Sequence, residues 1–236
     1  TYGKNKFHYF IKNSNNASLK DASPTDFDAG GHSLSQNTTG VDFSKYFEDA
    51  AKGINLAFGL EYRTENFIIF SGEEASYALY DEDGLPVTNP ATQTVAFDAN
   101  GDDLPGGSQG FPGYSPDNAV DRSRSNTSIY VDSEFNLTDN FLVGVALRYE
   151  DYSDFGSTFN YKLASRLKVN ENLAFRASLS TGFRAPSLAQ LYYNLKFTNI
   201  VNGESLPSLL SANNSTVTKA FGIQQLKEET AVNGSI

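Results

Sequence analysis

Residues 141–150 read Phe-Leu-Val-Gly-Val-Ala-Leu-Arg-Tyr-Glu, and large apolar side chains recur at every second position. The other set of alternate positions carries both charges of the stretch. Successive side chains of a β-strand point to opposite faces of a sheet, so this alternation predicts a strand with one apolar and one polar face. The apolar positions are Phe141, Val143, Val145, Leu147 and Tyr149.

Four further stretches show the same alternation. In all five stretches every charged residue falls on the same set of alternate positions, which we call the charged parity, and the other set is the apolar parity. We therefore expect a sheet with one apolar and one charged face. Weaker strands are expected near 6–12 and 41–48, and another begins near Lys227. The four further stretches are 54–65, 127–137, 159–169 and 173–184. The charged residues are Glu61, Arg63, Glu65, Asp132, Glu134, Arg148, Glu150, Lys162, Arg166, Lys168, Arg176 and Arg184.

The connections between these strands are short at one end of the sheet and long at the other. Short links occur at 48–53, 138–140 and 170–172, whereas at the opposite end only 154–157 is short. Soluble antiparallel sandwiches also alternate apolar and polar faces, but their strands run to about 5–6 residues. Outer-membrane barrels combine strands of about 9–11 residues with short periplasmic turns and long outer loops. The long outer loops are expected at about 13–40, 71–125 and 185–226.

Aromatic side chains gather near both ends of the predicted strands, as at the two interfaces of a bilayer. We therefore predict an all-β, transmembrane antiparallel β-barrel whose apolar parity faces lipid and whose charged parity faces a lumen. Gly59, Gly144 and Gly182 on the charged parity would fill a closed eight-stranded barrel poorly. Residues 1–236 are thus expected to form a partial barrel domain, about eight strands of a wider wall, because an open sheet edge cannot persist in lipid.

Composition narrows the classes of function. The 236 residues include 18 Lys and Arg, 28 Asp and Glu and 2 His, and the net charge of −10 disfavours nucleic-acid binding. Cys is absent, and His8 and His32 match no triad or metal pattern. No apolar run is long enough for a transmembrane helix. Because Met is absent and no signal peptide is recognisable, we expect a processed chain or an internal piece of a longer one.

Residues 180–192, Ser-Thr-Gly-Phe-Arg-Ala-Pro-Ser-Leu-Ala-Gln-Leu-Tyr, resemble a late strand segment of the TonB-dependent receptors. The hairpin residues at 148–156 and 160–166 are also similar to that family, as is Leu-Lys-Glu-Glu-Thr at 226–230. The Gly-rich loop at 106–114 looks like loops of receptors from Bacteroidetes-type bacteria. The resemblance is most specific between Asn126 and Thr230.

The resemblance implies a 22-stranded outer-membrane barrel that is plugged by an N-terminal globular domain. Such a receptor imports a scarce nutrient and is not an enzyme. The nutrient classes are siderophore, cobalamin-like, oligosaccharide and peptide. Implied partners are the chain's own plug and missing strands, the TonB–ExbB–ExbD complex through the absent N-terminal part, outer-membrane lipids and a surface lipoprotein. A non-transporting surface protein, either a small barrel or an adhesin, is the alternative.

Haem receptors of this family carry a His between the Phe-Arg-Ala-Pro segment and an Asn-Pro-Asn-Leu segment. No His occurs from Ser187 to Gln225, and the second segment departs from that pattern. Haem is therefore disfavoured, although His8 and His32 remain available as contributors.

Two groups of side chains are candidates for contact with a ligand or a plug. Aromatic side chains in outer loops offer contact area at modest entropic cost, but they could equally pack the loops on one another. Charged side chains of the lumen could contact plug or ligand, or pair across neighbouring strands as a charge ladder. The aromatic candidates are Phe111, Tyr114, Tyr192 and Tyr193. The charged candidates are Glu61, Arg63, Arg148, Arg176 and Arg184.

One acidic stretch is a weak candidate for Ca²⁺, which prefers carboxylate and carbonyl oxygens. Its register departs from that of an EF-hand, and a solvated acidic loop is the alternative. The candidate ligands are Asp98, Asn100, Asp102 and Asp103. No other cofactor and no catalytic residue is expected, because adjacent acids such as Glu228 and Glu229 face opposite sides of a strand.

Overall fold

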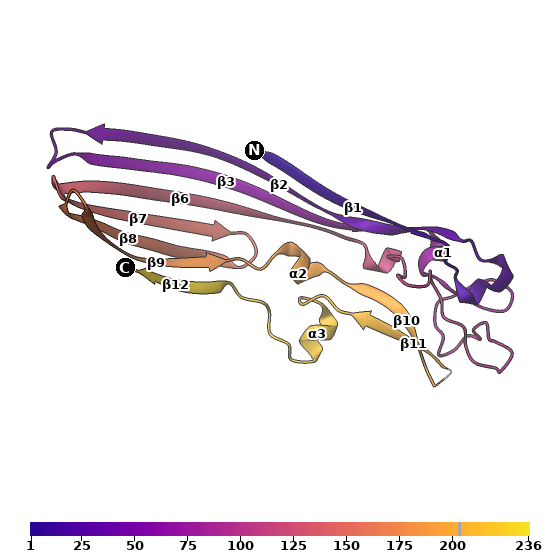
Figure 1. Ribbon diagram of the computed structural model, residues 1–236. Helices are drawn as coiled ribbons and strands as arrows, with labels where there is room; N and C mark the ends of the chain where they lie inside the picture. The colour runs from indigo at the N-terminus through magenta and orange to yellow at the C-terminus, as the bar shows by residue number, and fades with distance from the viewer. Residues whose placement is uncertain (203) are drawn as a thin grey trace.

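Eight long strands form one antiparallel sheet in the computed structural model, which describes residues 1–202 and 204–236. Their order is β1-β2-β3-β6-β7-β8-β9-β12, so each strand lies beside its neighbour along the chain (Figure 1). The strands are β1 (Tyr2–Lys12), β2 (Asp26–Phe47), β3 (Ile54–Phe70), β6 (Val120–Thr138), β7 (Phe141–Tyr152), β8 (Gly156–Asn170), β9 (Leu173–Arg184) and β12 (Glu229–Ser235).

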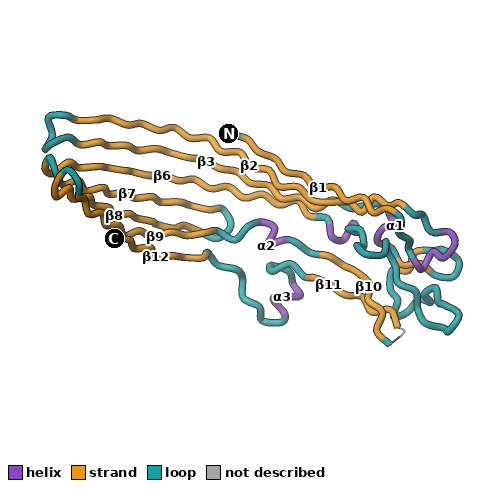
Figure 2. The backbone as a smooth tube through the Cα atoms, in the orientation of Figure 1, coloured by secondary structure: helices purple, strands orange, loops and turns teal. Residues whose placement is uncertain are grey.

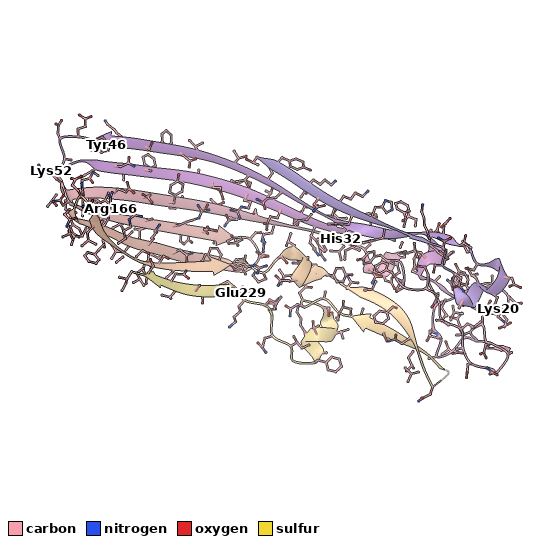
Figure 3. The ribbon with its side chains drawn as sticks, in the orientation of Figure 1. Lys20, His32, Tyr46, Lys52, Arg166 and Glu229 are labelled. Carbon is pink, nitrogen blue, oxygen red and sulfur yellow. The ribbon has the colours of Figure 1, made fainter. Side chains whose placement is uncertain are left out.

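The sheet is a section of wall that does not close on itself, with β1 and β12 at its two edges. The strands run side by side along the long axis, with tight turns at one end and long loops at the other (Figure 2). In Figure 3, Tyr46 and Lys52 mark the short-turn end, and Lys20 lies among the loops at the opposite end. This architecture confirms the predicted barrel wall and the predicted separation of short and long connections.

Register between the strands confirms the apolar face. One row across the sheet contains Val41, Leu60, Ile129, Tyr149 and Phe159, all of them exposed. Further rows repeat this composition toward the short turns. From Phe159 to Val169 the strand covers about 33 Å, which at the tilt usual in barrels rises about 25 Å, the height of a membrane-spanning apolar band.

At the loop end, the strands are longer than the sequence predicts. β2 begins at Asp26, inside the stretch expected to be a loop from 13 to 40, and has 22 residues. β6 begins at Val120, inside the loop expected from 71 to 125. The third expected loop, 185–226, continues to Glu228. These extensions lack apolar alternation because they lie beyond the apolar band. Their backbone hydrogen bonds to the neighbouring strands nevertheless continue.

The loops contain short elements of their own, and two hairpins among them were not predicted from the sequence. The hairpins pair β4 with β5 and β10 with β11. Among the described residues, no helix has the length and apolar character needed to span a membrane. The loop elements are η1 (Ala17–Ala22), α1 (Glu74–Tyr77), β4 (Leu79–Tyr80), β5 (Pro86–Val87), η2 (Pro116–Asn118), α2 (Leu188–Tyr192), β10 (Leu195–Val201), β11 (Glu204–Leu210) and α3 (Thr216–Ala220).

Gly59 on the polar face has a specific packing role. Tyr130 lies across it and donates a hydrogen bond from its hydroxyl to Asp42 Oδ1 at 2.6 Å. A Cβ at Gly59 would lie 2.5 Å from the Tyr130 ring and 2.4 Å from Asp42. Glycine is therefore required because a neighbouring aromatic ring occupies the space of its missing side chain.

Candidate functional site

The polar face carries a network of ion pairs near the loop end of the sheet. Glu61 of β3 accepts hydrogen bonds from Arg63 at 2.8 Å and from Arg148 of β7 at 3.3 Å. Arg148 also pairs with Glu150 and donates to Ser128 of β6 at 2.9 Å. Three adjacent strands thus contribute to the network because alternate residues of each strand face the same side.

Glu150 is the most buried carboxylate of this network, with 7% of its side chain exposed. Tyr152 donates its hydroxyl proton to Glu150 at 2.9 Å, and the Asn126 amide lies 3.4 Å from the same oxygen. Burial of a carboxylate is costly unless it is paired and hydrogen-bonded, and Glu150 meets both conditions.

Arg124 of β6 connects the sheet to the loops above it. Its guanidinium pairs with Glu65 of β3 and lies 3.5 Å from Asp154, which follows β7. It also donates to the backbone carbonyl of Pro186 at 2.7 Å, and only 5% of its side chain is exposed. Arg124 therefore ties the segment after β9 to strands β3 and β6, against which α2 also packs.

Hydrogen-bonding capacity remains inside this cluster. Arg63 and Asn126 face one another across β3 and β6. Arg63 Nε and Asn126 Oδ1 are buried and make no hydrogen bond with any described residue. A donor and an acceptor on neighbouring strands are thus the atoms of the network that can bind a further polar group.

Above the network, the same face of the sheet becomes apolar and is covered by the loops. Phe67 and Ile69 of β3 pack with Tyr114 and Leu188 into a buried cluster. Phe67 lies two positions beyond Glu65, so the cluster covers the face that carries the ion pairs. The loops before β6 and after β9 therefore fold inward over the polar face.

The two loops are also joined directly. The Tyr114 and Tyr193 hydroxyls lie 2.9 Å apart, and the Asn118 amide donates to Asn194 at 2.8 Å. Burial, followed by the hydrogen bond with Tyr193, raises the pKa of Tyr114 above its usual range. A neutral phenol is therefore the stable form at this contact.

The four aromatic candidates lie together but in different environments. Tyr114 is only 1% exposed, so its ring packs the loops on one another and cannot reach a ligand in this arrangement. Phe111 and Tyr193 are half-buried against it, with ring centroids at 5.8 Å and 6.1 Å. Tyr192 is half-buried beneath the Arg122 guanidinium. A ligand contact by Phe111, Tyr192 and Tyr193 stays a prediction.

The five charged candidates divide into two groups. The structure brings Glu61, Arg63 and Arg148 into one network. Arg184, at the end of β9 two strands from β7, is exposed and lies 4.0 Å from Glu229. Arg176 lies opposite Arg166 in β8, so the pair places like charges side by side near the short-turn end.

Sequence reasoning missed Arg124, Asn126 and Asp154. Arg124 fell within the stretch expected to be a loop up to 125, and the true start of β6 at Val120 places it on the polar face. The parity of Asn126 and Ser128, continued backwards through Arg124, was the signal that could have located it.

A cavity of about 880 Å³ opens beside the segment tied by Arg124. Pro186, Leu191 and Tyr192 line one side, and Phe155 and Asp154 from the turn after β7 line another. Residues 214–228 supply Lys219, Lys227 and several amide groups. This volume falls within the range of small-molecule sites, whereas the lining is more polar than is usual for such sites, because amide and charged residues outnumber apolar ones.

The two histidines lie on β1 and β2 near the loops. His8 Nε2 is 2.8 Å from Asp28 Oδ1. Figure 3 shows the position of His32 on β2. Its ring centroid lies 5.2 Å from that of Phe7 and 6.2 Å from that of Phe67. Their participation in haem binding stays a prediction.

The acidic candidate for Ca²⁺ forms a compact turn. Asp98 Oδ1 accepts backbone hydrogen bonds from Asn100 at 2.8 Å and Asp102 at 3.0 Å. These bonds lower the pKa of Asp98. Phe97 and Asp103 form an isolated β-bridge. Within the described ranges, no three His, Cys, Asp or Glu side chains are grouped for a metal ion, and Ca²⁺ binding stays a prediction that calorimetric titration at millimolar Ca²⁺ would test.

Comparisons with known proteins agree with this architecture. A family model described as "TonB dependent receptor-like, beta-barrel" matches residues 1–236. The vitamin B12 transporter BtuB of Vibrio vulnificus is 30% identical over 82 residues, which are 35% of this chain and 13% of that protein.

Solved structures of siderophore receptors share the fold. The receptor PirA of Acinetobacter baumannii matches with a TM-score of 0.56 at 18% identity, over 99% of this chain and 28% of that one. A mutant of the ferric enterobactin receptor PfeA of Pseudomonas aeruginosa matches with a TM-score of 0.57 at 16% identity, over the same shares. The chain therefore spans little more than a quarter of the length of these receptors.

Proposed function

Because the chain belongs to the TonB-dependent receptor family, we propose that it forms part of an outer-membrane transporter that imports a scarce nutrient by energised transport. The chain lies in the bacterial outer membrane, as its homologues do, with its apolar face toward lipid. A plug, further strands and the TonB–ExbB–ExbD complex complete the transporter in this proposal, and a surface lipoprotein is a further candidate partner.

The inward fold of the outer loops is the observation that carries this proposal. The segment after β9 is tied to the polar face by the bond from Arg124 to Pro186, and the half-buried Tyr192 lies beside the cavity. A molecule that arrives from the loop end meets aromatic and amide groups first and the charges around Arg63 and Asn126 next. Such an order suits capture followed by passage along the wall.

The named relatives support a ferric siderophore or a cobalamin over an oligosaccharide or a peptide. One relative is a vitamin B12 transporter, and two structural neighbours are siderophore receptors. The cavity volume of about 880 Å³ also falls within the range of sites for compact ligands.

Uptake by whole cells tests the function. A strain deleted for the complete gene is complemented with the wild-type gene or with the Tyr192→Ala variant, and radiolabelled ferric enterobactin and cyanocobalamin serve as probes. We expect energy-dependent uptake of one probe that a protonophore abolishes and Tyr192→Ala reduces. Tyr161→Ala, on the lipid face, is the matched control. Uptake of neither probe above the deletion strain would contradict the proposal.

The mass of the native polypeptide tests the architecture independently. A mass several-fold above 25.8 kDa is expected for a transporter wall with a plug. A native mass near 25.8 kDa would instead support the non-transporting small barrel or adhesin.

A further inference from the structure

A second cavity, which we call the loop pocket, lies among the outer loops. Its volume is about 490 Å³, and it has no lining residue in common with the cavity beside Tyr192. Its walls come from residues 74–90, from residues 115–117 and from the hairpin of β10 and β11. In Figure 1 this hairpin lies on the loop side of the molecule, away from the short turns. The loop pocket therefore exists because the hairpin folds against two segments that are remote in sequence.

The walls of the loop pocket are largely apolar. Two aromatic side chains of the lining, Tyr77 from α1 and Phe197 from β10, are half-buried. Further apolar lining residues are Leu79, Pro86, Val87, Pro90 and Leu209. An apolar lining with a few polar groups is typical of sites for small molecules, and the face of an aromatic ring attracts a cation.

The hydroxyl groups of serine and threonine in this lining already have partners within the chain. Ser115 donates a hydrogen bond to Asn118 Oδ1 at 3.0 Å. Ser208 accepts one from the Asn199 amide at 2.8 Å. The Thr88 hydroxyl is likewise bonded within its own loop. A ligand therefore finds its strongest polar partners among the charged groups of the lining.

These charged groups are two carboxylates and one ammonium. Lys196 of the hairpin pairs with Asp117 of η2, so an ammonium of the chain itself already occupies one carboxylate. The other carboxylate, Glu74, forms no ion pair with any residue in the described ranges 1–202 and 204–236. Burial, followed by the negative charges of Glu74 and Asp117, raises the pKa of Tyr77, so both carboxylates act on the same aromatic side chain. The loop pocket thus offers a cation an unpaired carboxylate close to an aromatic ring.

We propose that the loop pocket binds a small organic cation with an aromatic or branched apolar body. The cationic group contacts Glu74 and the rings of Tyr77 and Phe197, and the apolar body contacts the remaining walls. A bound cation then joins the hairpin to α1, as the pair of Lys196 and Asp117 joins it to η2. The inference does not rest on import, so a failure of the uptake experiment would leave it standing.

The test measures the binding of benzyltrimethylammonium to the complete receptor in detergent by ligand-observed NMR titration. Benzyl alcohol carries the same ring without a charge, and benzoate carries the opposite charge. We expect a measurable Kd for the cation and a Kd at least roughly fivefold higher for the other two probes. Glu74→Gln should raise the Kd of the cation roughly fivefold, because one charged contact is lost. Phe197→Ala should raise it by a similar factor, because an aromatic face is lost.

Asp83→Asn is the matched control, because Asp83 is an exposed carboxylate of the same loop that does not line the pocket. We expect this variant to bind the cation with an unchanged Kd. Resistance to unfolding in SDS at room temperature verifies assembly of each variant. Equal binding of the cation and benzyl alcohol, or equal effects of Glu74→Gln and Asp83→Asn, would overturn the proposal. An unchanged Kd in both Glu74→Gln and Phe197→Ala would overturn it as well.

Discussion

Replacement of Arg124 by alanine should loosen the segment that follows β9. The substitution leaves the carboxylates of Glu65 and Asp154, each with 19% of the side chain exposed, without their shared cation. It also removes the donor to the Pro186 carbonyl. Breaking a fully buried ion pair costs about 3–5 kcal/mol, and since both carboxylates keep some contact with water we expect about 2–3 kcal/mol.

Hydrogen exchange of the complete receptor in detergent measures this effect locally. The free energy of opening, read from backbone amides between Ser187 and Tyr193, should fall by about 2–3 kcal/mol in Arg124→Ala. Arg184→Ala is the matched control, because Arg184 and Glu229 are both about 70% exposed at 4.0 Å. We expect the control to change the opening energy by less than about 0.5 kcal/mol.

A double-mutant cycle decides whether the ion pair itself is responsible. Glu65→Ala and Arg124→Ala should be coupled by more than about 1 kcal/mol, since their charged groups are in direct contact. A coupling energy indistinguishable from zero, or equal effects of Arg124→Ala and Arg184→Ala, would refute the role assigned to Arg124.

Three other substitutions test separate parts of the fold. Val145→Arg places a charge on the lipid face and should destabilise the assembled barrel by about 2–4 kcal/mol, whereas Ala146→Ser on the polar face should have little effect. The shift in gel mobility on heating measures the assembly of both variants. Equal assembly would contradict the assigned faces. Gly59→Val should displace the Tyr130 ring, and the intrinsic fluorescence of that tyrosine, isolated by comparison with a Tyr130→Phe variant, should change; an unchanged signal would count against the packing described above. The pKa of Tyr114 is raised in the folded state, so its contribution to stability is complete below the unfolded pKa of about 10 and declines as the pH rises above that value. Thermal unfolding as a function of pH should show this decline, and Tyr114→Phe should abolish it. The same pH dependence in both proteins would contradict the assigned contact.

Alternation along the strands was enough to predict the wall and its two faces. Successive side chains of a strand point to opposite faces whatever strand lies beside it, so the period-2 pattern at 141–150 determines which side chains face lipid. Loop asymmetry and the segment at 180–192 then indicated the family. These features are local, and they were readable because lipid and lumen impose opposite chemistry on adjacent residues.

The structure at the loop end of the sheet depends on contacts that cannot be predicted from the sequence. β2 and β6 continue past the apolar band, where the strands stay paired without apolar alternation, so a sequence rich in Ser, Asn and Thr was interpreted as loop. Arg124 acquires its partners only when β3, β7 and the segment after β9 converge on it.

The sequence by itself determined the class of fold, the two faces and the end at which long loops occur, because these follow from spacing along one strand. Only the tertiary structure decided that Tyr114 is a packing residue, that Glu61, Arg63 and Arg148 share one network, and that Arg176 and Arg184 lie apart from it. The physical reason is that burial and charge pairing depend on distances between strands and loops that are remote in sequence. Such distances are set when the loops fold inward over the polar face.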